Sequence, residues 1–239
     1  MDNIKYILWD IDRTLIDFDY AEKEALKKCY AEYGFGVLTE ELLEEYKKVN
    51  DSYWEKLEKG EITRSELVVK RFKDFFSLHG IDPSIAEDFN NDYINSMGDI
   101  AYYTPNAEET IKTLKGHYKQ YAASNGSLVA QRKKLSKSGL DTLLDDVYIS
   151  GEMGVDKPSI EYFKEVFKRV GSTNLDEYVI IGDSISSDIL GGKRAGIKTI
   201  WYNPHNYVNS SDCIPDFEIH DIFEVLNILP IKNMEKECQ

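Results

Sequence analysis

Two aspartates, Asp10 and Asp12, stand one residue apart directly after a short apolar run at residues 4–9. Like charges this close repel each other, and burial at a strand end raises the pKa of both carboxyl groups. A divalent cation removes that cost, and Mg²⁺ prefers oxygen ligands. With Asp183, which follows a later apolar run, the pair predicts a magnesium site. Asp10 then suits a nucleophile that forms an aspartyl-phosphate, and Asp12 a general acid and base.

Two further segments supply groups that suit a phosphate. Ser124 and Asn125 precede Gly126 and a predicted helix start, where backbone N–H groups favour an anion. The commoner role of such a segment is an ordinary helix cap. Lys157 stands in a loop before a helix, where a lone lysine is usually a solvated surface charge. Together with the other motifs, it is expected to place its positive charge beside the phosphate and the Asp10 nucleophile.

A last segment runs from Gly182 through Asp183 to Asp188. Its ordinary interpretation is the capped start of a helix. Its functional interpretation puts Asp183 on the metal, and Asp188 on the metal or beside its ligands. All of these segments follow apolar runs, and parallel sheets bind ligands beyond the carboxyl ends of their strands. Their common location makes the combination far more specific than any single motif.

The elements that position these residues follow from the hydrophobic pattern. From residue 102 onward, short apolar runs alternate with amphipathic stretches that end at glycine. This alternation predicts an α/β fold with a Rossmann-like, doubly wound parallel sheet. The expected strands are 4–9, 118–124, 146–149, 178–182, 197–201 and 217–219, and the expected helices are 106–115, 127–138, 159–170, 184–195 and 221–229.

The stretch between the first strand and residue 102 has a different pattern. It shows helical periodicity with many charges, clearest at 21–30, 40–57 and 64–78, and no convincing strand. We therefore expect residues 1–16 and 102–239 to form the Rossmann-like core, and residues 17–101 to form an inserted, all-helical cap domain.

Taken together, the motifs resemble those of the haloacid-dehalogenase-like (HAD) phosphatase superfamily. The matching residues are Asp10-x-Asp12-x-Thr14, Ser124, Lys157, and Gly182-Asp183 with Asp188. The resemblance covers the whole chain, because the helical insertion falls where that superfamily places a C1-type cap. Many relatives carry glycine where this chain has Arg13, for which we expect a surface arginine paired with a nearby acid.

The resemblance also implies a division of labour within the site. It makes Asp10 the nucleophile and a Mg²⁺ ligand, and Asp12 the general acid/base, which binds Mg²⁺ through its backbone carbonyl. It has Thr14 orient Asp12, and it has Asp183 complete the metal site. Ser124 and Lys157 hold the phosphoryl group, and we count Thr14 and Asn125 with them as phosphate-binding residues.

Softer matches point to the substrate. Residues 14–19, 54–72, 154–158 and 201–204 resemble the bacterial HAD pyrimidine 5′-nucleotidases that act on non-standard nucleotides. The expected substrates are UMP, dUMP or dTMP. Aromatic residues in the helical stretch are able to contact a base, although packing inside the cap is their commoner role. They are Tyr46, Tyr53, Trp54, Phe72, Phe75 and Phe76.

Composition limits the partners. The 239 residues carry a formal net charge of −14, which disfavours nucleic-acid polymers and anionic membranes. Three cysteines without metal or disulfide spacing, no long apolar run and no signal-peptide pattern favour a cytoplasmic protein. The sequence leaves the oligomeric state open.

Other functions stay open at this level. A phosphatase of other small phosphometabolites and a phosphosugar mutase use the same motifs. A hydrolytic dehalogenase is disfavoured by Asp12. A receiver-like phospho-aspartate signalling module is disfavoured by Asp12 and by the helical insertion, since receivers are about one small domain long.

Overall fold

The computed structural model describes residues 1–231, which form two compact units. The sheet unit comprises Met1–Asp17, Tyr103–Gly126 and the chain from Ser138 onward, and the helical unit comprises Phe18–Tyr102 and Ser127–Lys137. Residues 127–137 thus group with the helices, whereas the sequence pattern assigned them to the core. The division into a catalytic core and a cap domain stays a prediction.

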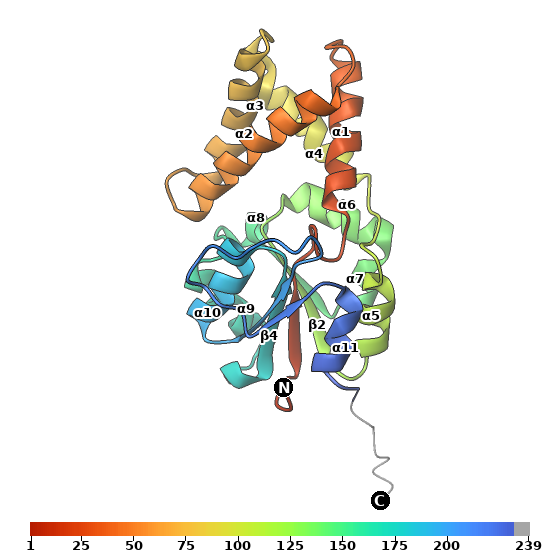
Figure 1. Ribbon diagram of the computed structural model, residues 1–239, viewed down its shortest axis with the longest axis vertical. Coiled ribbons are helices and arrows are strands. Elements are labelled where there is room, and N and C mark those ends of the chain that lie inside the picture. The colour runs from red at the N-terminus through yellow and green to blue at the C-terminus, as the bar shows by residue number, and fades with distance from the viewer. Residues whose placement is uncertain (232–239) are drawn as a thin grey trace, which may run out of the picture. The chain divides into compact units, whose positions relative to one another are not determined.

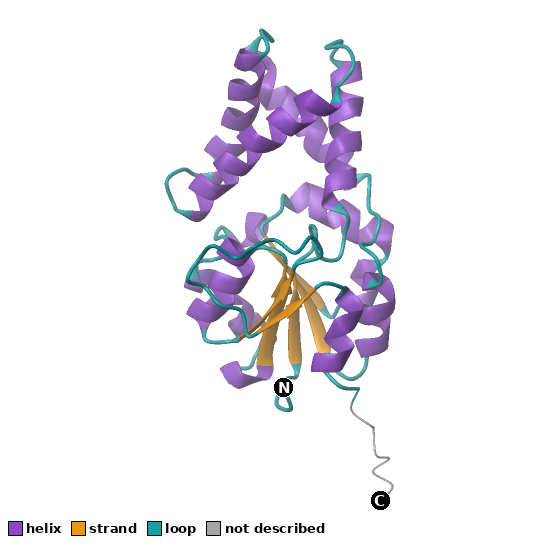
Figure 2. Cartoon of the chain, in the orientation of Figure 1, coloured by secondary structure: helices purple, strands orange, loops and turns teal. Residues whose placement is uncertain are grey.

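The sheet unit is built on six parallel strands in the order β3-β2-β1-β4-β5-β6. The strands form the central layer in Figure 2. The predicted α/β class with a parallel sheet and a helical insertion is confirmed. The strand bounds are β1 Tyr6–Trp9, β2 Lys119–Ser124, β3 Asp146–Ile149, β4 Tyr178–Gly182, β5 Lys198–Tyr202 and β6 Phe217–Ile219.

Helices cover both faces of this sheet, as a doubly wound fold requires. In Figure 1, α9 and α10 lie on one side of the strands, and α5 and α11 lie on the other. The helices of the sheet unit are α5 Ala107–Leu114, α7 Leu140–Leu143, α8 Ser150–Met153, α9 Ile160–Val170, α10 Leu190–Ala195 and α11 Val225–Ile228.

Two predicted helices are less regular than the pattern indicated. The stretch 184–195 begins with a π-helical turn at Ile185–Ile189 before α10, and 221–229 is a 3₁₀ turn at Ile222–Glu224 followed by the short α11. In the first, the wide turn accompanies a hydrogen bond from the Ser184 N–H to the Asp188 carboxylate (3.1 Å). Such turns are common at functional sites.

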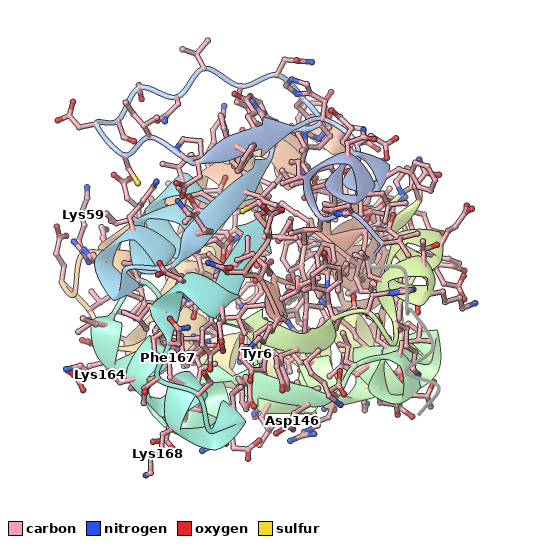
Figure 3. All side chains as sticks on the ribbon, turned by 90° about the horizontal axis from the view of Figure 1, so that it is seen from below. Tyr6, Lys59, Asp146, Lys164, Phe167 and Lys168 are labelled. Carbon is pink, nitrogen blue, oxygen red and sulfur yellow. The ribbon has the colours of Figure 1, made fainter. Side chains whose placement is uncertain are left out.

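The amino ends of the strands are closed by aromatic packing. The ring of Tyr6, at the start of β1, lies 4.7 Å from that of Tyr178, and the ring of Phe167 lies 4.6 Å from that of Tyr178. Figure 3 views this end, with Tyr6, Phe167 and Asp146 labelled. Ligand chemistry is therefore left to the opposite, carboxyl ends.

The helical unit contains four main helices and the later α6 Leu128–Ser138, and it has no strand. In space, α1 packs against α4, α4 packs against α3, and α3 packs against α2. Threonine caps begin two of them, with Thr39 bonded to the Leu42 N–H and Thr63 in a capping box with Glu66. The four helices are α1 Phe18–Glu32, α2 Glu40–Glu58, α3 Arg64–Leu78 and α4 Ala86–Gly98.

Most of the aromatic residues proposed to contact a base lie in the interior of this unit instead. The residues Tyr46, Phe72, Phe75 and Phe76 are fully buried in its hydrophobic core. Tyr53 is nearly buried, and its hydroxyl donates to the Asp74 carboxylate (2.6 Å). The prediction that these residues contact a base is therefore wrong. Trp54 is partly exposed, and the Arg64 guanidinium lies over its ring (5.5 Å).

A polar network runs through the same interior. The Arg71 guanidinium on α3 donates to Asn50 Oδ1 on α2 (2.8 Å) and to Asn90 Oδ1 on α4 (3.0 Å). Beside it, the Tyr93 hydroxyl donates to Glu22 on α1 (3.4 Å). All five side chains are at most 5% exposed. Because buried polar groups need partners, this network favours one arrangement of the four helices.

We expect Arg71→Leu to lower the free energy of unfolding by about 3–5 kcal/mol, the usual cost of removing one member of a buried charged network. The amide oxygens of Asn50 and Asn90 lose their donor in this variant. Urea denaturation followed by circular dichroism measures the change. The matched control is Lys70→Leu on the same helix, where an exposed pair with Glu66 is lost and little change is expected. Equal effects of the two substitutions would contradict the structural role of the network.

Two remaining sequence predictions concern cysteines and membranes. Cys29 and Cys213 are free thiols, and Cys238 lies outside the described residues. Within residues 1–231, no helix combines the length and the apolar character that crossing a bilayer needs.

Candidate active site

The parallel register brings the reactive segments to one edge of the sheet. Trp9, the last residue of β1, pairs with Ala122 of β2 and Ile181 of β4. Asp10 therefore emerges between the ends of β2 and β4. This is the topological position where parallel sheets bind ligands.

Lys157 is the centre of the site. Its ammonium group donates to Asp10 Oδ1 (2.7 Å), to Asp188 Oδ1 (2.6 Å) and to the Ala123 carbonyl (2.6 Å). The side chain is 1% exposed. The three donor positions of the ammonium are thus directed at three acceptors from three segments of the chain. The sequence pattern alone favoured a solvated surface lysine, and the structure places it in the interior.

The backbone of Lys157 is fixed by Asn125. The Asn125 side-chain amide donates to the Lys157 carbonyl (2.8 Å), and its oxygen accepts from the Lys157 N–H (2.8 Å). This side chain therefore holds the loop that carries Lys157 against the end of β2, and its contact with a phosphate stays a prediction. Neighbouring Ser124 is buried, and its hydroxyl accepts from the Gly126 N–H (3.1 Å).

Asp188 reaches the site because Gly182 has no side chain. A Cβ atom at position 182 would lie 2.2 Å from Asp188 Oδ2, which no real structure tolerates. Asp188 then bonds Lys157 with one oxygen and the Ser184 N–H with the other. Its position suits a group that orients Lys157 and the turn that follows Asp183.

Asp183 is held from two sides. Its carbonyl accepts from the Trp201 indole N–H (2.8 Å), and its carboxylate accepts from the Thr14 hydroxyl (3.4 Å). Thr14 is fully buried, and its own carbonyl accepts from the Thr104 hydroxyl (2.6 Å). Thr14 is thus placed to orient Asp183, and its contact with a phosphate stays a prediction. Sequence reasoning singled out residues 201–204 only as a matching stretch, and it missed the contact of Trp201 with Asp183 and that of Thr104 with Thr14.

The site has an excess of negative charge in a buried place. Burial raises the pKa of Asp10 well above its ordinary range, and Asp188 and Asp183 add to this while Lys157 opposes it. Burial and the charge of Asp188 likewise raise the pKa of Asp183, to about 7. Burial lowers the pKa of Lys157, but Asp10 and Asp188 outweigh it and the net shift is upward. Lys157 therefore stays cationic, and it does not balance the carboxylates alone.

A divalent cation would balance this excess of negative charge. Oxygens of Asp10, Asp183 and Asp188 lie within 4.8 Å of one another. Carboxylate oxygen is the donor that Mg²⁺ prefers, and Mg²⁺ usually takes one or two carboxylates together with water and substrate. Since both oxygens of Asp188 are engaged with Lys157 and Ser184, Asp10 and Asp183 fit best as direct ligands. Asp12, the other predicted ligand, is partly exposed on the loop after Asp10.

Comparison with known proteins places this arrangement in context. A family model described as haloacid dehalogenase-like hydrolase matches residues 7–202. The HAD-hydrolase YfnB of Bacillus subtilis is 33% identical over 98% of both chains. A crystal structure of YfnB bound to magnesium superposes with a TM-score of 0.91 and 32% identity, covering 96% of this chain and all of that one.

Relatives with named substrates point in two directions. The pyrimidine 5′-nucleotidase PynA of Streptococcus pneumoniae is 32% identical to this chain, and the alignment covers 97% of this chain and 98% of PynA. The glyceraldehyde 3-phosphate phosphatase of Methanocaldococcus jannaschii is 28% identical over 98% of this chain and all of its own.

Proposed function

Because the chain belongs to the haloacid dehalogenase-like hydrolases, we propose that it is a magnesium-dependent phosphomonoesterase that works through Asp10. The observation that carries the proposal is the buried contact of Lys157 with Asp10 and Asp188, next to Asp183. A carboxylate that is aligned by a buried ammonium and flanked by a metal-binding carboxylate is suited to attack a phosphoryl group. The receiver-like alternative is set aside, because relatives of full length are hydrolases.

In the first step, the Asp10 carboxylate attacks phosphorus and forms the acyl-phosphate bond as the ester P–O bond breaks. The Asp12 carboxylic acid gives its proton to the leaving oxygen, which departs as an alcohol. Lys157 opposes the upward shift that burial gives the pKa of Asp10, and it offers positive charge to the phosphoryl oxygens. Bound Mg²⁺ supplies further positive charge where negative charge develops.

In the second step, Asp12, now a carboxylate, takes a proton from water. The resulting nucleophile attacks phosphorus, the P–O bond to Asp10 breaks, and inorganic phosphate leaves. Asp12 is again protonated and Asp10 is again a carboxylate, so that the cycle closes. The partial exposure of Asp12, compared with the burial of Asp10, suits a group that meets both the leaving group and water.

For the substrate, we propose a preference for pyrimidine nucleoside 5′-monophosphates such as dUMP. The similarity to PynA supports it, while the weaker similarity to the glyceraldehyde 3-phosphate phosphatase supports a broader small-molecule phosphatase. The groups around Asp10, which are Lys157, Asp183 and Asp188, are suited to bind a phosphate and a metal ion. Discrimination between leaving groups therefore rests on residues outside them.

The kcat/KM values for dUMP, glyceraldehyde 3-phosphate, phosphoglycolate and glucose 6-phosphate test this preference under identical magnesium. We expect dUMP to be used at least about tenfold more efficiently, because even one methylene group in an apolar pocket contributes roughly 1–3 kcal/mol of discrimination and a base is much larger. A purine control, dGMP, separates base recognition from general nucleotide recognition. An efficiency for dUMP equal to or below that of the sugar phosphates rejects the nucleotidase and leaves the phosphatase chemistry standing.

A further inference from the structure

Trp201 lies near the end of β5, in a stretch to which the proposed mechanism assigns no role. Its side chain is 5% exposed, and its indole N–H donates to the Asp183 carbonyl (2.8 Å). In the register of the sheet Trp201 pairs with Gly182, so that the indole reaches the residue directly after β4. A buried indole N–H needs an acceptor, and any nearby carbonyl would satisfy it. The acceptor here is the backbone of a proposed metal ligand.

The carbonyl that Trp201 contacts belongs to the peptide group between Asp183 and Ser184. The N–H of this same peptide group donates to Asp188 Oδ2 (3.1 Å). One planar unit is thus held at both of its polar ends, by an indole from β5 and by a carboxylate from the turn after β4. Because the peptide group is rigid, the two bonds fix the rotation about the Cα–C bond of Asp183.

The carboxylate of Asp183 has a looser restraint of its own. The hydrogen bond that it accepts from the Thr14 hydroxyl is 3.4 Å long, beyond the usual range for two oxygens. The two bonds to the peptide group are therefore the firmer restraint on where this carboxylate lies. An oxygen of Asp183 lies within 4.8 Å of one from Asp10, and Mg²⁺ demands nearly ideal octahedral geometry from such ligands.

The same peptide group is connected to the nucleophile. Asp188 uses its other oxygen to accept from Lys157 (2.6 Å), and Lys157 donates to Asp10 (2.7 Å). A continuous series of hydrogen bonds therefore runs from Trp201 through one peptide group, Asp188 and Lys157 to Asp10. Its first two bonds have the same direction along the peptide group, so that each strengthens the other. The indole N–H thus supports both the metal side and the nucleophile side of the site.

We propose that Trp201 is a positioning residue for Mg²⁺, whose indole N–H fixes the peptide group after Asp183 and thereby orients the Asp183 carboxylate toward the metal. The inference rests on Asp183 as a metal ligand of the proposed function, and not on which ester is cleaved. A tryptophan that only filled the interior would contribute to the free energy of unfolding and leave the Mg²⁺ affinity unchanged.

The test removes the donor and keeps an aromatic ring. Calorimetric titration with Mg²⁺ alone, without substrate, compares the wild-type chain with Trp201→Phe. We expect the Mg²⁺ Kd to rise about tenfold, the lower end of what the loss of a group that supports a metal ligand costs. An isosteric replacement, Trp201→benzothienylalanine, in which sulfur takes the place of the N–H group, separates loss of the donor from loss of volume. It should weaken Mg²⁺ binding to a similar extent, and it repeats the measurement if Trp201→Phe folds poorly.

The matched control is Tyr178→Phe, at the amino end of β4. There a buried hydroxyl that donates to the Ser172 carbonyl (2.9 Å) is lost, so that one bond from a side chain to the backbone disappears far from the metal. Its Mg²⁺ Kd should stay within about twofold of the wild-type value, because distant sites act independently. Thermal denaturation without Mg²⁺ checks that each variant is folded.

An unchanged Mg²⁺ Kd in the folded donor-free variants of Trp201 overturns the inference. An equal rise of the Kd in Tyr178→Phe also overturns it, and so does an absence of Mg²⁺ binding in the wild type. If the wild type binds Mg²⁺ but releases no phosphate from any ester, the proposed function fails, while a higher Kd confined to the Trp201 variants still supports the positioning role.

Discussion

Replacing Asp10 by asparagine is expected to reduce phosphate release by roughly 10⁴-fold or more, as loss of a covalent nucleophile does in other enzymes. The substitution preserves the shape of the side chain and its contact distance to Lys157 (2.7 Å in the wild type) while removing the nucleophilic carboxylate. Steady-state release of inorganic phosphate measures the loss. Thermal denaturation checks that the variant is folded.

The matched comparison is Asp12→Asn, two residues along the same loop. Here the nucleophile remains and only acid–base assistance is lost, so we expect a smaller reduction of roughly 10²–10⁴-fold. A substrate with a good leaving group, such as p-nitrophenyl phosphate, should recover part of the first step in Asp12→Asn and none of it in Asp10→Asn. Near wild-type turnover in Asp10→Asn would show that another group attacks the phosphorus.

Removal of magnesium is expected to abolish measurable turnover. Without the cation, the carboxylates of Asp10, Asp183 and Asp188 face one another with Lys157 as the buried counter-charge, and a substrate dianion adds to the repulsion. Treatment with EDTA followed by phosphate-release assays tests this, and added Mg²⁺ should restore full activity. Thermal denaturation of the same samples provides an independent readout, because a ligand that binds only the folded state raises the Tm. Full activity after exhaustive chelation would contradict the metal site.

The fold and the location of the reactive residues at one edge of the sheet were predictable from the pattern of apolar runs. Asp10, Ser124 and Asp183 each end an apolar run, and parallel strands align their carboxyl ends, so convergence follows from topology. The predicted family, fold class and parallel sheet are confirmed. The predicted magnesium cofactor accords with the carboxylate cluster and with the magnesium-bound structure of YfnB.

Contacts between distant segments were not predictable in this way. The hydrogen bonds between Asn125 and the Lys157 backbone join positions 32 residues apart, and the hydrogen bond from Trp201 to Asp183 joins positions 18 residues apart. The first depends on how the loop that carries Lys157 folds back over the sheet. The second depends on the register of β5 against β4, in which Trp201 pairs with Gly182, and periodicity encodes neither. Phe72 and Tyr46 illustrate a different limit. Aromatic residues at helical spacing suit the interior of a helical unit as well as a ligand-facing wall, and the structure places these two in the interior.

Trapping the phosphorylated enzyme tests the central claim most directly. Wild-type protein with Mg²⁺ is mixed with substrate that carries a radiolabelled phosphoryl group, quenched in acid within the first turnovers, and digested for peptide mapping. The account predicts label on the peptide that contains Asp10, in a bond cleaved by hydroxylamine, and no label in Asp10→Asn or after chelation. Release of phosphate with no labelled enzyme at any time, or label on a residue other than Asp10, would contradict it.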